Sequence, residues 1–200
     1  MSDHYVDLRK AIYTTDNELK RFRTVIVNSV LSTDIVNKDL KELRNKRWEL
    51  AFSEGARNAD RYRASSVLEH LIQASDVSHT MQHWHVYRAW NERLFEEMYL
   101  AYKQGRAEKD PSEFWYKGEL GFFDFYIIPL AKKLAEVGVF GVSSSEYYDF
   151  AVKNRAEWEL KGKDVVQGMI LKVNGGVDYQ SGEVHASTED LIDVGTEAEC

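Results

Sequence analysis

Helical periodicity over long stretches is the feature that most limits what this chain can fold into. Residues 83–105 read HWHVYRAWNERLFEEMYLAYKQG, and apolar side chains recur there every three or four positions. This spacing places them on one face of an α-helix. Gly105, at the end of the run, is a common helix terminator. The predicted apolar stripe consists of Tyr87, Trp90, Leu94, Met98 and Ala101.

The same periodicity predicts further helices over residues 16–34, 37–52, 60–75, 119–138 and 143–162. In the third of these helices we expect an inward face made of Val67, Leu68, Leu71 and Ile72. In the fourth, Pro129 should cause a kink and Gly138 should end the helix. The chain has only two prolines and 12 glycines in 200 residues, and no segment alternates like a strand. We therefore predict an all-α, compact helical bundle.

Composition excludes several classes of protein. The formal charge is −7 without a basic block, which argues against nucleic acid or an anionic membrane surface as a partner. The single cysteine, Cys200, cannot form an internal disulfide. The sequence shows no transmembrane run and no secretory signal, so we expect a cytoplasmic protein, or one at the cytosolic face of a membrane within a longer polypeptide. Residues 166–200 are expected to form an acidic, disordered tail behind a domain of residues 1–165.

The segment ASDVSHTMQHWH, residues 74–85, concentrates metal-binding side chains. On a continuous helix Asp76, His79 and His83 would share one face, and two histidines four residues apart can chelate a metal. The commoner interpretation is an exposed helix start that happens to contain histidines. Asp76 alone could cap the following helix, which is the more frequent role, or coordinate a hard metal from the wall of a cleft.

Aromatic side chains crowd the segment from residue 114 to residue 126. Most of them must belong to the core, but one could stack on a planar ligand. Glu119 lies beside this group at a helix start. It could complement the helix dipole or serve as a polar contact for such a ligand.

Several separated motifs resemble one known family in order and spacing. They are VLSTDI (residues 30–35), LIQASDVSHTMQHWHVYRAWNERLFEEMY (71–99), GELGFFDFYIIPLAKKL (118–134) and NRAEWE (154–159). Together they resemble the C-terminal half of the class I 3′,5′-cyclic nucleotide phosphodiesterase catalytic domain, in the branch found in algae and other protists. The resemblance covers roughly residues 20–160 and implies the all-α fold of that domain.

The resemblance implies roles for individual residues. Asp76 matches a ligand of the tightly bound metal, and Asp34 matches an acid near the metals, while His79 occupies a variable position beside the pocket. Phe122 matches the phenylalanine that clamps the purine ring. Glu119 stands where the family has a glutamine that hydrogen-bonds the purine edge. The positions implied to line the base pocket are Leu94, Phe95 and Met98.

Two family motifs are absent from this sequence, namely His-Asn-x-x-His-Ala and His-Asp-x-x-His-Pro-Gly. They supply the remaining metal ligands and the general-acid histidine, so no catalytic histidine is assigned here. We expect an incomplete catalytic domain. The complete one would hydrolyse cyclic AMP or cyclic GMP to the 5′-monophosphate with two divalent metals, zinc plus magnesium or manganese. The alternative is a non-catalytic binding or interaction module. Expected partners are a cyclic nucleotide and either the missing N-terminal half-domain or a second copy of the chain.

Overall fold

The computed structural model describes residues 5–53 and 59–175, and these residues form helices and turns without a strand. The predicted all-α fold is therefore confirmed. The α-helices are α1 (Val6–Ile12), α2 (Asp16–Ser32), α3 (Lys38–Phe52), α4 (Ala59–Asp76), α5 (Trp84–Lys103), α6 (Trp115–Phe122), α7 (Ile128–Glu136) and α8 (Ser144–Val173). Short 3₁₀ turns are η2 (Ser78–Met81), η3 (Pro111–Glu113) and η5 (Gly141–Ser143), and η4 (Phe123–Ile127) is a π-helical turn.

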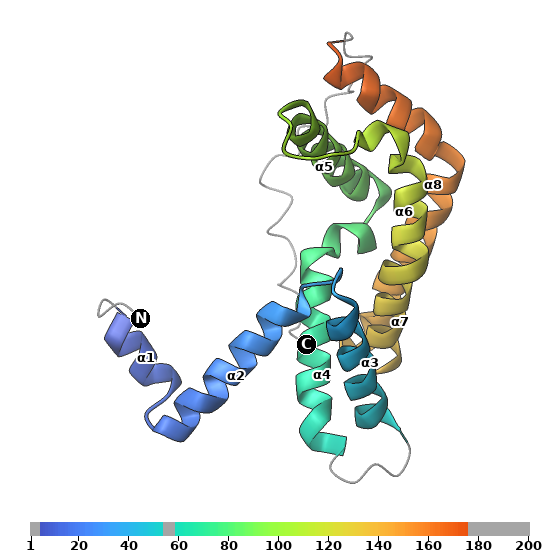
Figure 1. Ribbon diagram of the computed structural model, residues 1–200. Helices are drawn as coiled ribbons and strands as arrows, with labels where there is room; N and C mark the ends of the chain where they lie inside the picture. Colours follow the sequence, from blue (N-terminus) through green and yellow to red (C-terminus); the bar gives the residue numbers. More distant parts are fainter. Residues whose placement is uncertain (1–4, 54–58, 176–200) are drawn as a thin grey trace, which may run out of the picture.

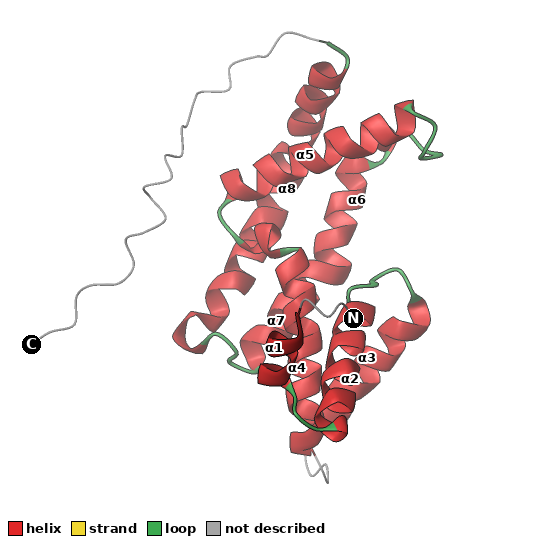
Figure 2. Ribbon diagram, turned by 90° about the vertical axis from the view of Figure 1, so that its left-hand side faces the viewer, coloured by secondary structure: helices red, strands yellow, loops and turns green. Residues whose placement is uncertain are grey.

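Helices α3 to α8 pack together, whereas α1 and most of α2 project from this body as an arm (Figure 1). In the body, α3 lies against α4, and α8 runs along α5, α6 and α7 (Figures 1 and 2). The arm joins the body at the end of α2, where the Gln73 side chain donates a hydrogen bond of 2.6 Å to the Ser32 carbonyl. No helix within the described ranges has the length and apolar character needed to cross a bilayer.

Local sequence signals explain several helix boundaries. Thr15 and Glu18 form a capping box that begins α2, and the Asn37 side chain accepts backbone hydrogen bonds that begin α3. Gly138 has φ +65° just after α7, so this helix ends as predicted. A π-helical turn, η4, lies one turn before Pro129, where a kink was predicted. A proline ring displaces the carbonyl four residues before it, which favours such a widened turn.

The hydrophobic core lies where α5, η4, α7 and α8 meet. Its fully buried aromatic side chains are Tyr87, Phe95, Phe123 and Trp158. The predicted stripe of α5 is wrong by about one position, because the buried face carries Tyr87, Asn91, Phe95 and Tyr99. Trp90 and Leu94 are about half exposed. Apolar spacing did not predict this face, because the face includes the polar residue Asn91.

Helix α4 also departs from its predicted inward face. Its most buried residues include Ser66, Glu69, His70 and Gln73, whereas Leu68 is 40% exposed. Hydrogen bonds engage the side chains of His70 and Gln73 on this polar face, and Glu69 forms an ion pair with Arg47 at 3.1 Å. Apolar periodicity cannot detect a buried face of this kind.

Helix α8 holds the turn between α4 and α5 in place. The buried Asn154 amide donates to the carbonyls of Thr80 and Gln82 at 2.9 and 2.7 Å. The helix continues to Val173, so the expected start of the tail at residue 166 falls inside it. The remainder of the predicted tail, residues 176–200, lies outside the described residues.

Candidate functional site

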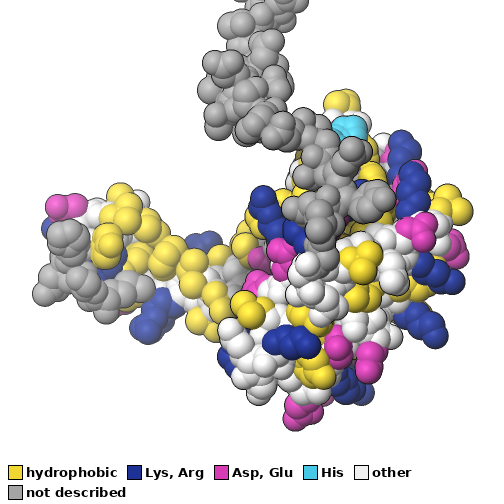
Figure 3. All heavy atoms as spheres, turned by 90° about the horizontal axis from the view of Figure 1, so that it is seen from above, with side chains coloured by type: hydrophobic (Ala, Val, Ile, Leu, Met, Phe, Trp, Pro, Cys, Tyr) yellow, Lys and Arg dark blue, Asp and Glu magenta, His cyan; other side chains and the backbone are white. Residues whose placement is uncertain are grey.

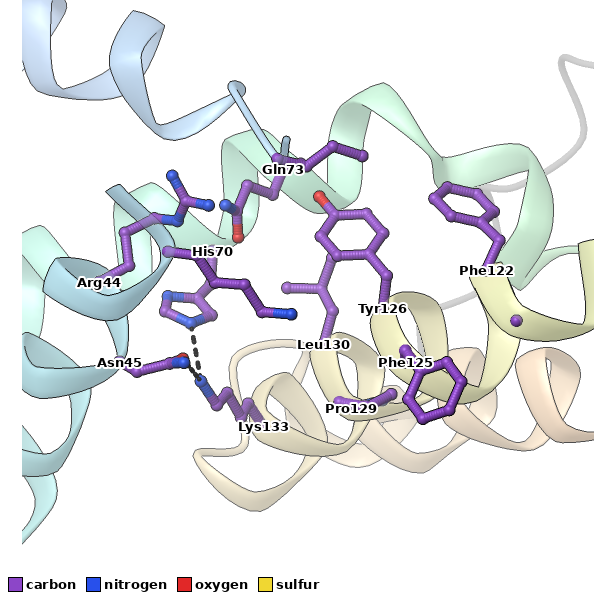
Figure 4. Close-up of a pocket in the computed structure, with 13 residues that line it drawn as sticks. Arg44, Asn45, His70, Gln73, Phe122, Phe125, Tyr126, Pro129, Leu130 and Lys133 are labelled. Carbon is purple, nitrogen blue, oxygen red and sulfur yellow. Dashed lines mark hydrogen bonds between the residues drawn. The ribbon is translucent and has the colours of Figure 1, made fainter. Parts of the chain in front are cut away.

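A cavity of about 270 Å³ lies between α3, α4, η4 and α7 (Figure 4). One end is polar and the other is aromatic. Phe122 and Tyr126 form the aromatic part, with their rings stacked at a centroid distance of 5.3 Å. They share a face because they are four residues apart across the junction of α6 and η4. This end could hold a flat ligand.

Asp34 and Asp76 do not line this cavity, although each acts on a residue that does. Arg44 Nη1 donates a hydrogen bond of 3.1 Å to the Asp34 carbonyl, and the charge of Asp76 acts on Tyr126. Asp76 is the last residue of α4, and its side chain is exposed. Burial is the main reason why the pKa of Tyr126 rises to about 12, and the charge of Asp76 adds to this shift. The Asp34 carboxylate accepts hydrogen bonds from the Val36 and Asn37 amides at 3.2 and 3.1 Å. Asp34 thereby stabilises the turn between α2 and α3. Asp76 does not cap the next helices, because the N-cap residues of η2 and α5 are Val77 and His83.

The histidines near Asp76 do not combine with it into a metal site. The segment is not one helix, because α4 ends at Asp76, η2 follows, and α5 begins at Trp84. Among the described residues, no three His, Cys, Asp or Glu side chains gather closely enough to hold a metal ion. The ring of His83 instead stacks on that of His85 and meets Phe150 edge-on at 4.6 Å.

His79 lies on η2 and is half-buried. Burial lowers the pKa of its imidazole, which favours the neutral ring. The ring centroid is 6.2 Å from that of Trp90. His79 is therefore placed beside the exposed side of α5.

Glu119 ends a chain of hydrogen bonds that links α5 and α6. Trp115 Nε1 donates to Asn91 Oδ1 at 3.0 Å, Asn91 Nδ2 lies 3.5 Å from the Tyr87 hydroxyl, and that hydroxyl donates to Glu119 Oε2 at 2.7 Å. Burial raises the pKa of Glu119 to about 7 and also raises that of Tyr87. Tyr87 thus fixes the orientation of a carboxyl group that titrates near neutrality.

The structure does not bring the three predicted base-pocket residues of α5 to the same cavity as Phe122. Phe95 has no exposed surface and packs edge-on against Trp115 at 5.2 Å, so it is a core residue. Leu94 and Met98 are 46% and 38% exposed, and neither lines the cavity.

Several cavity residues escaped the sequence argument. Arg44, His70 and Lys133 line the polar end, yet each belongs to a different helix and no motif connects them. Two residues outside the cavity, Tyr87 and Asn91, were also not predicted as functional, because Tyr87 was assigned only to the apolar stripe of its helix and Asn91 was given no role. Their spacing of four residues, with a buried asparagine, is the signal that could have indicated a hydrogen-bonded pair.

These features define an all-helical domain with a ligand-sized cleft that has an aromatic end and a polar end. The family model for 3′5′-cyclic nucleotide phosphodiesterase matches residues 3–139. The chain therefore belongs to the 3′,5′-cyclic nucleotide phosphodiesterase family, as the motifs predicted.

Curated relatives agree with this assignment. The chain is 25% identical over 170 residues to the dual specificity calcium/calmodulin-dependent 3′,5′-cyclic nucleotide phosphodiesterase 1B of Bos taurus. The matched region covers 78% of this chain and 30% of the relative. The human protein of the same name is 26% identical with the same coverage. A probable 3′,5′-cyclic-AMP phosphodiesterase of Caenorhabditis elegans is 26% identical over 133 residues, which is 58% of this chain and 19% of that protein. No solved structure matches.

Proposed function

We propose that this chain forms the downstream part of a catalytic domain that hydrolyses 3′,5′-cyclic nucleotides to 5′-monophosphates. The chain spans about 30% of the length of the mammalian relatives that it matches. The observation that carries the proposal is the cleft lined by Phe122, the residue that the family resemblance selects as the clamp of the purine ring. Asp76 lies outside the lining, but its charge acts on Tyr126, whose ring stacks on that of Phe122. We propose Phe122 as the wall for the base and Asp76 as a metal ligand.

The side chain of Asp76 suits this role. It is exposed, and it has no hydrogen bond or ion pair with another described residue, so its oxygens can coordinate a hard cation. Asp34 has one carboxylate oxygen engaged by backbone amides. Two divalent metals, zinc plus magnesium or manganese, would supply Lewis-acid stabilisation of the phosphate charge in the complete domain. The described residues do not provide the whole ligand set, so further ligands must come from the other part of that domain.

The arm supports the idea of a second part. Five apolar side chains of α2 are between 44% and 64% exposed, and apolar side chains run along the arm (Figure 3). They are Val25, Ile26, Val27, Val30 and Leu31. A soluble domain rarely leaves so continuous an apolar surface uncovered. We propose that the upstream part of the catalytic domain covers it.

The test joins this chain behind the upstream half of a family catalytic domain that carries both histidine motifs. With zinc and magnesium, the joined protein should hydrolyse a cyclic nucleotide. The substitution Asp76→Asn should reduce kcat/KM by at least about a hundredfold, because the amide no longer supplies the charge that holds the metal.

Asp164→Asn is the matched control, since it removes an exposed acid from α8 away from the cleft, and it should leave the rate unchanged. Bound zinc is measured in parallel. A folded joined protein that turns over equally well with the Asp76→Asn substitution would contradict the proposed ligand.

A further inference from the structure

Arg44 of α3 is buried although its side chain is cationic. Its side chain is 5% exposed, and its Nη1 donates one hydrogen bond of 3.1 Å to the Asp34 carbonyl. Within the described part of the chain no ion pair includes Arg44, although the neighbouring Arg47 pairs with Glu69. Burial lowers the pKa of Arg44, which reflects the cost of keeping this charge inside. A buried guanidinium of this kind is stabilised when an anion binds to it.

Lys133 of α7 approaches the same space from the opposite wall (Figure 4). Its ammonium donates to Asn45 Oδ1 at 3.1 Å and lies 3.3 Å from His70 Nε2. Because His70 Nδ1 lies 2.8 Å from the Ser66 carbonyl, Nδ1 carries the proton and Nε2 accepts from Lys133. Burial lowers the pKa of His70 to about 4, so its ring is neutral at pH 7. His70 and Asn45 therefore engage two of the three N–H groups of the ammonium, and the Nζ atom lies 5.2 Å from the centroid of the Trp48 ring. One N–H group remains without a hydrogen bond to a described residue.

Lys41 adds a third positive charge at the same end. Among the described residues that line the cavity, none is acidic. The charges of Asp34 and Glu69 act on Arg44, and the charge of Glu49 acts on Lys133. These three carboxylates lie outside the lining of the cavity. Three cationic groups thus converge on one space without an internal counter-charge.

We propose that this polar end of the cavity binds a phosphate dianion, either free or as part of a phosphomonoester. A guanidinium fork and two ammonium groups supply the charge-assisted N–H donors that phosphate oxygens accept. A cavity of about 270 Å³ exceeds the needs of phosphate alone. The aromatic end, at Phe122 and Tyr126, has room for the organic part of a phosphomonoester. This site needs no metal and does not depend on the proposed hydrolysis.

The test uses the 200-residue chain without metal, by isothermal titration calorimetry at mildly alkaline pH and constant ionic strength. The titrants are inorganic phosphate, adenosine 5′-monophosphate and adenosine. We expect saturable binding of both phosphate compounds and not of adenosine. Tighter binding of the nucleotide would identify a phosphomonoester as the ligand, and equal binding would identify the free anion.

Four single substitutions test which residues bind the phosphate. Arg44→Met should weaken phosphate affinity at least about tenfold, because it removes the bidentate donor. Lys41→Met, at an exposed position where the fold is retained, and Lys133→Met should each weaken it about three- to fivefold. Lys46→Met removes an equal charge from the outer surface of α3, where Lys46 pairs with Glu42, and should leave the affinity unchanged. Absence of saturable binding, or equal affinities in all four variants, would overturn the proposal.

Discussion

At the scale of single residues, Glu119 shows how burial and one hydrogen bond define what a side chain can recognise. An ionised carboxylate only accepts hydrogen bonds, which suits the N1–H and N2–H₂ donors of guanine. A protonated carboxyl group also donates, so it can satisfy N1 of adenine. With a pKa of about 7, Glu119 changes between these states near neutral pH.

We predict that a complete domain carrying Glu119 prefers cyclic GMP increasingly as the pH rises. The carboxyl group ionises above its pKa, so the ratio of kcat/KM for cyclic GMP over cyclic AMP should increase at least about fivefold from about pH 6 to about pH 8. Tyr87 stays neutral over this range, because its pKa is raised, and continues to donate to Glu119.

The substitution Glu119→Gln should remove this pH dependence, because an amide donates and accepts at every pH. Glu113→Gln, an exposed acid on the neighbouring turn η3, is the matched control and should preserve the dependence. If the ratio follows the same pH profile in all three proteins, Glu119 does not contact the base.

At the scale of elements, α8 depends on a close approach between two of its own residues. Gly162 is buried, and a Cβ atom there would lie 2.9 Å from two ring carbons of Trp158. Trp158 has no exposed surface, and its Nε1 donates to the Tyr116 carbonyl at 3.1 Å, so its ring cannot move freely. The absence of a side chain at residue 162 therefore lets α6 and α8 pack.

We predict that Gly162→Ala lowers the free energy of unfolding by about 1–3 kcal/mol, because the new methyl group displaces the Trp158 ring. Gly168→Ala on the same helix meets no atom within 4 Å and is the matched control. It should raise the free energy of unfolding by about 0.5–1 kcal/mol, through helix propensity alone. Denaturant titrations followed by circular dichroism measure both. Equal stabilisation by the two substitutions would show that the indole has room to shift.

At the scale of the whole molecule, the described part of the chain brings an aromatic wall and cations together in one cavity. It does not contain a group of three or more His, Cys, Asp or Glu side chains that could hold a metal ion. We predict that the purified 200-residue chain, supplied with zinc and magnesium, leaves cyclic AMP and cyclic GMP intact. Nucleotide analysis after prolonged incubation measures this. Metal-dependent turnover that is lost in Asp76→Ala would show instead that the chain completes its own site, for example in an oligomer. A chain that binds without turnover would act as the non-catalytic binding module.

The sequence predicted the helical class, the order of the helices and the family, because helical periodicity, terminators such as Gly138 and ordered motifs are local properties of a chain. It also selected Phe122, which lines the cavity, and Asp34 and Asp76, which lie outside its lining. It misplaced the buried faces of α4 and α5, since His70 and Asn91 are buried through hydrogen bonds that apolar spacing does not report.

Which distant side chains meet depends on how the helices pack and cannot be read from local patterns. Arg44, His70 and Lys133 come from three helices, and their convergence depends on how α3, α4 and α7 pack. The link from Tyr87 to Glu119 spans 32 positions, and the pKa of that carboxyl group is set mainly by burial. The burial and the electrostatic environment of a side chain depend on all of its neighbours in space. A linear sequence pattern therefore predicts which types of side chain are available, but not their pKa values or which charged groups lie together.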